Sequence, residues 1–529
     1  MTSDFSARTL YAITFLEGAV VMAIEILGAR ILAPFFGTSL IVWTSVIAVT
    51  LISLTGGYYL GGVLSIRKNL PDVLFFQVLI VAIFIGFMAT WATRLYGLFV
   101  TASIYSGSVI CALLVIGPPL VTLSSTTPVI IKLLTKDPSG SGKAAGTVYA
   151  VSTTGGIIFT LLTGFFIIPV FGISVPLLIF AGILLAAALS AIPVAMKRKL
   201  TYGGGALLLF LFQTAGQAGK KRQAGRIEIP YVTEGLMGQL KVVDRHDPGQ
   251  NLQLRHLLIN GIPQTRIVND DYAVSFWKYV HLVAMYASLK NGSPSVLLCG
   301  FGGGSIATEL CRMNMKVDAV EIDGRMLDIS KNYFHFRDTA LRFIADDGRH
   351  YIRTTDKKYD LIVFDVLNGE VQPSYMFTVE SFNEMKNLLN PGGMILIEFQ
   401  ELFMNGELFV YKSISNTMEA SGFHAWHSPD YFTKDPLRDV ILIGSVNEID
   451  FSALNSSKMT PCCAHQPWLK DVLVKPAETH GGLFPGIETL ADDKPVLDHL
   501  KTETQKVWRE NMRADFTRLE MEEGRRLFR

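Results

Sequence analysis

Charged residues are scarce in this sequence, and the shortage is uneven along the chain. They make up 18% of its 529 residues, whereas soluble globular proteins usually carry about 25%. Asp and Glu are almost absent from residues 9–220, while residues 221–529 have the mixture of an ordinary soluble domain. Because a chain of this length also exceeds one hydrophobic core, the sequence predicts at least two domains, with a boundary near residue 220.

Paired cysteines and a large net charge are missing as well. The five cysteines show no Cys-x-x-Cys spacing, which disfavours a disulfide framework and favours a reducing compartment for the C-terminal half. Cys462, Cys463 and His465 have no second ligand pair at zinc spacing, so we expect no bound metal. A net charge of +1 gives no reason to expect nucleic acid as a partner.

The N-terminal part contains long apolar runs. A transmembrane helix needs about 20 apolar residues, and six runs qualify: 11–36, 40–65, 73–93, 105–131, 145–169 and 171–195. A seventh run, 200–219, is uncharged but rich in Gly, Thr and Gln, so it either crosses a membrane or lies at its surface. The sequence therefore predicts a polytopic α-helical membrane bundle of six or seven spans within residues 1–220.

Basic residues between these runs indicate how the bundle is oriented. Arg94 lies on one side of the predicted membrane. The other basic residues lie on the opposite side, which the positive-inside rule makes cytoplasmic: Arg8, Arg67, Lys68, Lys132, Lys136, Lys143 and residues 197–199. Six crossings then place the C-terminal domain in the cytoplasm. Seven would place it outside.

Three charged residues lie within the first apolar run: Glu17, Glu25 and Arg30. A charge in the middle of a membrane helix costs about 2.5–3.5 kcal/mol on insertion scales. These residues therefore indicate either a polar site or substrate path inside the bundle, or a structural ion pair, or an arginine that reaches the interface. Small residues in the second and fifth runs, Gly57-x-x-x-Gly61 and 153–156, predict close contacts between helices.

The C-terminal half alternates strands and helices after a small β region. Residues 227–244 and 254–264 have the pattern of short strands, and residues 271–289 have helical apolar spacing. Further strands are predicted at 294–299, 316–322, 342–345, 360–365 and 394–399. This order predicts a Rossmann-like α/β domain of the class I methyltransferase type with a doubly wound parallel sheet. The predicted domains are 1–220 (membrane bundle), 226–292 (β hairpins and helix), 293–505 (Rossmann-like) and 506–529 (charged helical tail).

A glycine-rich loop follows the first of these strands and opens a helix. Gly300, Gly302 and Gly304 allow the backbone to turn tightly and to approach a ligand closely. Glu321 ends the next strand about 20 residues later, where an acid accepts hydrogen bonds from ribose hydroxyls. The pattern predicts a nucleoside site. It fits a nicotinamide dinucleotide as well.

Two more acids end successive strands. Asp347, in Asp346-Asp347-Gly348, could accept a hydrogen bond from an adenine amino group. Asp365 stands at the edge where open α/β sheets bind ligands and follows an apolar strand, which makes it a candidate base or cation binder. Each acid alone is explained as a turn cap. Together with Glu321 beside a glycine loop, they favour a site.

These residues lie in stretches that resemble a known family. The C-terminal half resembles the spermidine synthases (polyamine aminopropyltransferases), and the whole chain resembles bacterial membrane proteins in which such a domain follows a multi-span region. The stretches are FLEGAVVMAIEILGARILAPFFG (15–37), LLINGIPQT (257–265), VLLCGFGGGSIATEL (296–310), AVEID (319–323), ADDGRHYI (345–352), YDLIVFDVLNG (359–369), PSYMFTVESF (373–382), LNPGGMILIEF (389–399) and LADDKPVLDHL (490–500).

The resemblance implies S-adenosylmethionine or its decarboxylated form as the co-substrate, without a metal. It implies that the nucleoside contacts Gln264, Gly300, Gly302, Gly304, Glu321, Asp323, Asp347 and Gly348. Within that set, Glu321 would hold the ribose, Asp347 the adenine, and Gln264 would lie near the sulfonium. Asp365 would bind and deprotonate the attacking amine. Contacts with the acceptor are implied for Asn368, Tyr375 and Asp493.

Three positions depart from the family pattern. Gly303 stands where the family's glycine loop usually has Asp, Ser275-Phe276 stand where it has a Tyr-His or Tyr-Gln pair, and Asn368 replaces the second acid of its "DxxD". The groups that bind the amine are therefore fewer, while the groups that bind the nucleoside are kept. Loss of the loop Asp also removes a charge that would repel the carboxylate of S-adenosylmethionine.

The leading hypothesis is a membrane-bound transferase that passes an aminopropyl or related group to an amine or lipid-soluble acceptor. The expected location is the bacterial inner membrane, in contact with lipid and with the catalytic domain in the cytoplasm. A homo-oligomer is a further expectation, because the soluble enzymes of the family are oligomers. The alternatives are a methyltransferase, a sulfonium lyase, a transporter with a nucleoside-sensing domain, and an inactive scaffold.

Overall fold

The structure is a computed structural model of the chain. It describes residues 6–37, 40–97, 99, 104–135, 137–206, 227–235, 237–247, 251–270, 273–337, 341–367, 372–402, 410–429, 437–454, 478–479, 484, 486–494, 497–501, 503–508 and 510–511. The chain divides into two compact units. We call Met1–Gln223 with Thr233–Gln239 the helical unit, and Ala224–Val232 with Leu240–Leu527 the sheet unit.

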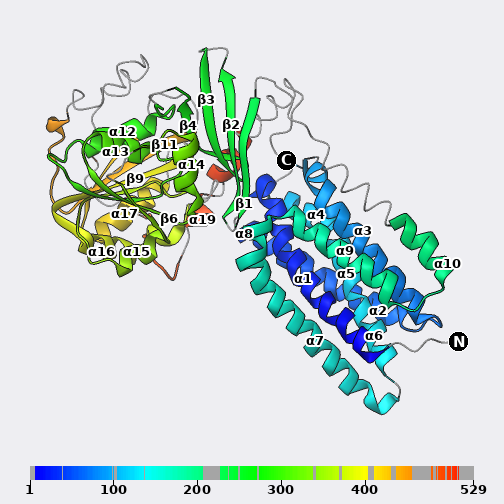
Figure 1. Cartoon of the computed structure of the whole chain (residues 1–529). Coiled ribbons are helices and arrows are strands. Elements are labelled where there is room, and N and C mark those ends of the chain that lie inside the picture. Colours follow the sequence, from blue (N-terminus) through cyan, green and yellow to red (C-terminus); the bar gives the residue numbers. More distant parts are fainter. Residues whose placement is uncertain are drawn as a thin grey trace. The chain divides into compact units, whose positions relative to one another are not determined.

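The helical unit consists of apolar helices that pack side by side (Figure 1). Their bounds are α1 (Ala7–Phe36), α2 (Leu40–Leu64), α3 (Leu70–Gly97), α4 (Ile104–Val115), α5 (Gly117–Ser124), α6 (Thr126–Leu134), α7 (Ser141–Leu162), α8 (Ile168–Phe171), α9 (Ser174–Ala191) and α10 (Met196–Arg198). A π-helical turn at Thr163–Ile167 joins α7 to α8. Aliphatic and aromatic side chains form the core of the unit, together with buried polar residues such as Glu17, Gln77 and Ser108.

Four helical stretches in the described residues are long and apolar enough to cross a membrane: Ala7–Ala33, Ile41–Leu64, Leu70–Ala92 and Ser141–Phe171. The predicted run 105–131 is instead a pair of helices, Tyr105–Val115 and Gly117–Leu134, bent by 47°. Pro118 and Pro119 explain the break, because proline has no N–H to donate to the preceding turn. If the bent pair is one span, there are five.

The last two predicted runs are shorter helices or lie outside the described residues. The run 171–195 forms the shorter apolar helix α9, which is not one of the four stretches named above. Of the run 200–219, residues 207–219 lie outside the described part of the chain. The count of six or seven spans therefore stays a prediction, while an N-terminal set of membrane-compatible apolar helices is established.

Glycines bring the helices of this unit into close contact, as their spacing predicts. A Cβ added to Gly57 or Gly61 of α2 would lie 1.8 Å from Ser124 Oγ or 2.3 Å from the Ser125 carbonyl oxygen, respectively. A Cβ added to Gly155 of α7 would lie 2.2 Å from the carbonyl oxygen of Phe15 in α1. Only glycine fits where two backbones approach this closely.

We expect Gly155→Ala to lower the thermal stability of the helical unit, because a backbone carbonyl cannot move aside as a side chain can. Overpacking of this kind typically costs about 1–3 kcal/mol. The matched control is Gly146→Ala in the same helix, where an added Cβ meets nothing within 4 Å. The control should be neutral or stabilising, because alanine favours helix more than glycine does. Unfolding midpoints of the two purified variants test this, and equal midpoints would contradict it.

Most of a small antiparallel sheet, in the order β1-β2-β3-β4, belongs to the sheet unit. Its strands are β1 (Ile227–Gly235), β2 (Gly238–Asp247), β3 (Leu252–Ile259) and β4 (Ile262–Val268). Asn260 and Gly261 connect β3 to β4, and both have positive φ angles, of 50° and 81°. Asn-Gly is the preferred pair for a tight hairpin turn of this kind. The predicted β region is confirmed, and its helix is α12 (Lys278–Ala287).

The main sheet has eight strands in the order β12-β10-β11-β9-β8-β5-β6-β7. Their bounds are β5 (Ser295–Cys299), β6 (Lys316–Glu321), β7 (Arg342–Ala345), β8 (Tyr359–Phe364), β9 (Leu389–Leu402), β10 (His424–Pro429), β11 (Leu437–Ser445) and β12 (Glu478–Thr479). Strands β5 to β9 pair in parallel as predicted. The sheet as a whole is mixed, because β11 runs antiparallel to both β9 and β10, and β10 to β12.

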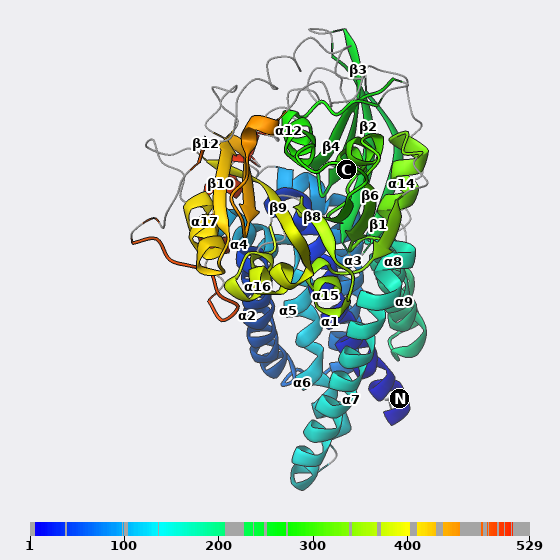
Figure 2. The ribbon, with the colours of Figure 1, turned by 90° about the vertical axis from the view of Figure 1, so that its left-hand side faces the viewer.

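Helices cover both faces of this sheet. Figure 1 shows α12, α13 (Ser305–Arg312) and α14 (Arg325–Tyr333) on one face, with α15 (Gly348–Thr354), α16 (Val379–Leu388) and α17 (Val410–Ala420) on the other; Figure 2 gives the view turned by 90°. A last short helix is α19 (Leu497–Leu500). Successive residues of β5 point to opposite faces, so Leu298 packs in one core and Leu297 in the other. The predicted Rossmann-like domain of the methyltransferase type is confirmed.

Candidate functional site

The candidate site lies at the carboxyl ends of β5 and β8, which are neighbours in the centre of the main sheet. The chain runs outward from β5 through β6 and β7 and then returns to β8 on the other side of β5. Open α/β sheets bind their ligands at such a reversal. Here the two strand ends are tied together, because the N–H of Asp365 donates to the Cys299 carbonyl oxygen at 2.9 Å.

Gly300 is the first residue of the loop after β5. Its φ is 90°, in the region that favours glycine. An added Cβ would lie 1.9 Å from the carbonyl oxygen of Asp365. Glycine is therefore required at this position both for its backbone angle and for the close approach of the β8 end.

The predicted loop and its acid meet in the structure. Gly302 and Gly304 also have positive φ angles, of 52° and 85°, and Gly304 precedes the first residue of α13. The Glu321 carboxylate accepts hydrogen bonds from the N–H groups of Phe301 (3.0 Å), Gly302 (3.3 Å) and Asp323 (3.1 Å). Burial raises the pKa of Glu321, and these hydrogen bonds oppose the rise.

The position where the family pattern has Asp is explained by packing. The N–H of Gly303 donates to Thr265 Oγ1 at 2.9 Å. A Cβ added to Gly303 would lie 2.7 Å from Thr265 Cγ2 and 2.9 Å from its Cβ. The β4 hairpin therefore fills the space that an aspartate side chain would need, and no negative charge stands at this point of the loop.

Asp365 is half-buried at the end of β8, and Tyr279 of α12 is 7% exposed beside it. The Tyr279 hydroxyl donates to Asp365 Oδ2 at 3.3 Å. Desolvation raises the pKa of Asp365 to about 6, and the nearby Glu321 charge adds to the rise. Burial and the Asp365 charge raise the pKa of Tyr279 well above its usual value. The two side chains thus form a hydrogen-bonded pair at the strand ends, and each keeps its proton to a higher pH than usual.

A second carboxyl group, from Glu398, lies next to Asp365. Phe364 of β8 pairs with Ile397 of β9, so Asp365 and Glu398 follow at the next position of each strand. Glu398 is 2% exposed, and its Oε2 has no hydrogen-bond partner among the described residues. Burial and the Asp365 charge raise its pKa well above the usual range, and a hydrogen bond links the two carboxyl groups. We infer that Glu398 is the protonated member and donates to the Asp365 carboxylate.

The sequence-based reasoning did not identify Tyr279 or Glu398. The family's Tyr-His pair falls at Ser275-Phe276 in the sequence, yet Ser275 Oγ accepts from the Trp277 N–H at 3.2 Å and Phe276 packs against the Arg266 guanidinium at 5.5 Å. The phenol that reaches Asp365 comes from the following helix. Glu398 had a visible signal, an acid between Ile397 and Phe399 inside an apolar strand.

Asp347 caps the N-terminus of α15. Its carboxylate accepts from the N–H groups of Arg349 and His350, both at 3.0 Å, and from the Tyr375 hydroxyl at 2.7 Å. Burial, together with the hydrogen bond to the Asp347 carboxylate, raises the pKa of Tyr375. Two predicted site residues thus touch one another, and Asp347 has the cap role that was the structural alternative. Its contact with adenine stays a prediction.

The remaining predicted residues are placed as follows. Asp323 is buried and forms an ion pair with Arg325 at 2.6 Å. Gln264 is half-buried on β4, one residue before Thr265. Gly348 begins α15, where an added Cβ would lie 3.1 Å from Met376 Cε. Asp493 is exposed, and Asn368 lies outside the described residues. The ligand contacts predicted for these residues stay predictions.

The stretch that contains Asp493 is held in place by its neighbour. Asp492 pairs with the buried Arg349 guanidinium at 2.6 Å and accepts from Thr378 Oγ1 at 2.7 Å. Arg349 also pairs with Glu384 of α16 at 2.9 Å. The hydrogen bond from Arg349 and, to a smaller extent, that from Thr378 lower the pKa of Asp492. The 490–494 segment is thus fixed to α15 and α16. No group of three or more potential metal ligands occurs within the described residues.

Comparison with known proteins points to one family. Residues 279–429 match the family described as Spermine/spermidine synthase domain. The sheet unit contains a spermidine synthase-like domain. A polyamine aminopropyltransferase of Thermoplasma volcanium is 32% identical over 126 residues, 22% of this chain and 46% of that relative. One from Buchnera aphidicola is 28% identical over 186 residues, 33% of this chain and 63% of that relative.

A solved structure was also found to be similar. The crystal structure of a probable spermidine synthase from Corynebacterium glutamicum has a TM-score of 0.39 and 20% identity to this chain, and the match covers 51% of this chain and 97% of that one. The chain spans 46% and 63% of the length of the two curated relatives above. The spermidine synthase-like domain thus contains β5 to β9 and the strand ends that carry Asp365 and Glu321.

We expect Asp365→Asn to stabilise the protein at alkaline pH and to leave its stability unchanged near pH 4. The folded protein holds the Asp365 proton up to about pH 6, whereas an unperturbed Asp has a pKa of 3.8. The folded state therefore binds more protons than the unfolded chain between these values, and wild-type stability falls as the pH rises through this window. The amide does not ionise and avoids this loss.

Unfolding midpoints measured from pH 4 to pH 8 check the expectation. The difference between Asp365→Asn and wild type should grow from near zero at pH 4 to a plateau above pH 7. Asp328→Asn, which removes an exposed carboxylate from α14, controls for the loss of one charge. A difference that is the same at every pH would contradict the placement of Asp365 in a desolvated pair.

Proposed function

We propose that the protein is a membrane-bound, spermidine synthase-like transferase that uses S-adenosylmethionine or its decarboxylated form and passes an aminopropyl or related group to an amine. The observation that carries the proposal is the desolvated carboxylate of Asp365 at the β5–β8 reversal, with the Tyr279 hydroxyl 3.3 Å away. The match to the spermidine synthase domain and the polyamine aminopropyltransferase relatives supports transferase chemistry.

The glycine loop supports the nucleoside half of the proposal. Three left-handed glycines let the backbone between β5 and α13 approach a ligand. Glu321 lies against the loop, and both of its carboxylate oxygens accept hydrogen bonds from backbone N–H groups. The hydroxyls of a ribose are also hydrogen-bond donors, so they would take the place of these N–H groups. We assign the ribose contact to Glu321 and place Gln264 near the sulfonium. Asp347 remains the proposed adenine contact.

A bound sulfonium supplies an electrophilic carbon and a thioether leaving group. The amine nitrogen forms a bond to that carbon, the carbon–sulfur bond breaks, and its electron pair stays on sulfur. Asp365 accepts the proton that the amine loses, and its raised pKa suits a base that works near neutral pH. Tyr279 and Glu398 hold the carboxylate in place, and desolvation strengthens its attraction for the ammonium form of the acceptor.

Both forms of the nucleoside remain within the proposal. Thr265 fills the space beside Gly303, so the loop carries no acid that would repel the carboxylate of S-adenosylmethionine. The acceptor is an amine or a lipid-soluble molecule that carries one. The helical unit would anchor the enzyme in a bacterial inner membrane through its long apolar helices, with the transferase domain in the cytoplasm, and a homo-oligomer is part of the proposal.

Product analysis distinguishes the proposed reaction from its alternatives. Purified full-length protein is incubated with each nucleoside and a diamine such as putrescine, and the products are identified by mass spectrometry. Methylthioadenosine with an aminopropylated amine supports the proposal. Methylthioadenosine alone indicates a lyase, S-adenosylhomocysteine indicates a methyltransferase, and tight binding without any product indicates a sensor. The last three results would each overturn aminopropyl transfer.

We expect Asp365→Asn to abolish turnover while nucleoside affinity changes less than about threefold, because the amide cannot take a proton but fits the same space. Tyr279→Phe should lower the rate by roughly 10²-fold or less, since it removes a supporting hydrogen bond rather than the base. Single-turnover rates and nucleoside titrations measure both effects. Asp328→Asn again serves as the control. Full turnover by Asp365→Asn would disprove its role.

A further inference from the structure

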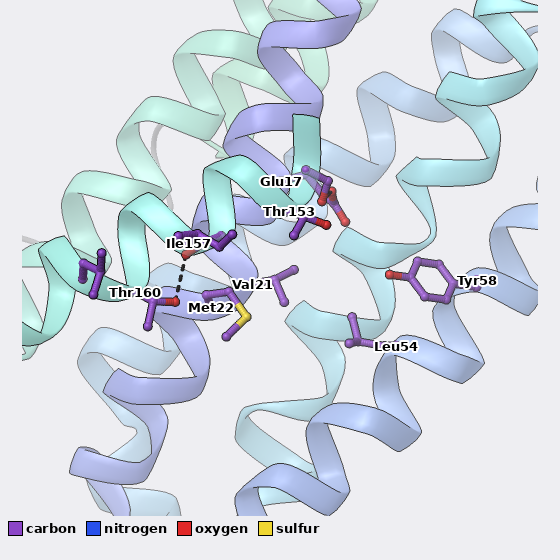
Figure 3. Close-up of a pocket in the computed structure, with 12 residues that line it drawn as sticks. Glu17, Val21, Met22, Leu54, Tyr58, Thr153, Ile157 and Thr160 are labelled. Carbon is purple, nitrogen blue, oxygen red and sulfur yellow. Dashed lines mark hydrogen bonds between the residues drawn. The ribbon is translucent and has the colours of Figure 1, made fainter. Parts of the chain in front are cut away.

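The helical unit has a partly open cavity of about 440 Å³ between α1, α2 and α7. This volume is in the range of sites that hold small molecules. Figure 3 shows side chains from all three helices around it. Its wall includes Glu17, Val21, Met22, Leu54, Tyr58 and Ser152. The cavity therefore lies within one unit and belongs to a different part of the chain from the transferase site.

One carboxylate lies at this cavity. Glu17 is 3% exposed and accepts hydrogen bonds from Ser152 Oγ at 2.7 Å and Thr127 Oγ1 at 3.2 Å. Both partners are neutral hydroxyls, and no ion pair involves Glu17 within the part of the chain that the structure describes. A buried carboxylate is costly without a counter-charge. The two hydroxyls thus orient the Glu17 carboxylate, but no described cationic side chain pairs with it.

The position of Glu17 is fixed by the contact between α1 and α7. A Cβ added to Gly18 would lie 1.8 Å from the Ser152 carbonyl oxygen, and one added to Gly155 would lie 2.2 Å from that of Phe15. Two glycines therefore let the helix backbones touch on either side of Glu17. Such tight packing holds the carboxylate against Ser152 at the edge of the cavity.

The rest of the cavity wall is mainly apolar, with one phenol. Val21, Met22 and Leu54 contribute aliphatic and thioether surface, and Tyr58 approaches from α2 on the side opposite to α7 (Figure 3). The Tyr58 ring also packs edge-on against Tyr149 at 6.3 Å. Aromatic rings attract cations through their faces. An occupant must match one negative charge at one end and an apolar surface along the remainder.

We propose that this cavity binds an organic ammonium ion with an apolar stem, and that Glu17 is its counter-ion. An inorganic cation would leave the apolar wall unmatched, and a neutral apolar molecule would leave the carboxylate without a counter-charge. The ammonium donates to the Glu17 carboxylate, and its stem lies along Met22 and Leu54. This site is independent of the transferase reaction proposed above.

The probe for the test is 4-phenylbutylamine, and its neutral counterpart is 4-phenylbutan-1-ol. All samples are full-length protein in detergent that carries Asp365→Asn, so that the transferase site lacks its proposed amine-binding carboxylate. Calorimetric titration at pH 7 should show saturable binding of the amine, with at least tenfold weaker binding of the alcohol. Glu17→Gln keeps an oxygen that accepts from Ser152 and Thr127, and it should weaken amine binding at least tenfold.

The matched control is Glu25→Gln, which removes the other acid of α1 without touching the cavity wall. It should leave the affinity for the amine within about twofold. Leu54→Trp fills the cavity but keeps Glu17, and it should abolish binding even if Glu17→Gln fails to fold. Equal binding of amine and alcohol, full affinity in Glu17→Gln or Leu54→Trp, or no saturable binding at all would overturn the proposal. Transferase activity is measured separately, on protein that keeps Asp365. None of these binding results therefore bears on the proposed function.

Discussion

The transferase-like site depends on the contact between the ends of β5 and β8. The Asp365 N–H donates to the Cys299 carbonyl oxygen, and the Asp365 carbonyl oxygen lies where a Cβ of Gly300 would be. One close backbone approach thus sets both the start of the glycine loop and the position of the candidate base. The loop in turn holds Glu321, through the N–H groups that follow Gly300. Any side chain at Gly300 would separate the glycine loop from the candidate base.

Desolvation of Asp365 raises its pKa and so suits it to accept a proton. Asp365 lies between a buried phenol and a buried carboxyl group rather than beside an arginine or lysine. By contrast, Asp492 faces Arg349, which lowers its pKa and makes it a structural anchor. The two acids show how surroundings separate roles, because a paired carboxylate stays charged and inert while a desolvated one exchanges its proton near neutral pH.

Local patterns in the sequence predicted the parallel strands, the glycine loop and the acids at the strand ends, because each depends on residues close together in the chain. Glu398 and Tyr279 were missed since their roles depend on non-local placement. Glu398 reaches Asp365 through the register of β9 against β8, and Tyr279 through the docking of α12. The antiparallel β11 likewise depends on pairing between distant segments. The bend at Pro118 has a local cause, which a count of apolar residues does not take into account. An apolar window of about 20 residues does not distinguish a straight span from a bent pair.

The two units each contain a carboxylate in similar surroundings. In each, a carboxylate is held by a backbone contact that only glycine allows, Gly300 for Asp365 and Gly18 for Glu17. A tyrosine lies close by in each, as Tyr279 or Tyr58. Within the described residues neither carboxylate forms an ion pair. A desolvated carboxylate of this kind favours a cation that also brings apolar surface, because such a cation costs less to strip of water than a small ion. An amine meets this requirement at both places, so the chemistry proposed for the transferase domain and the ligand proposed for the helical unit are consistent with one another.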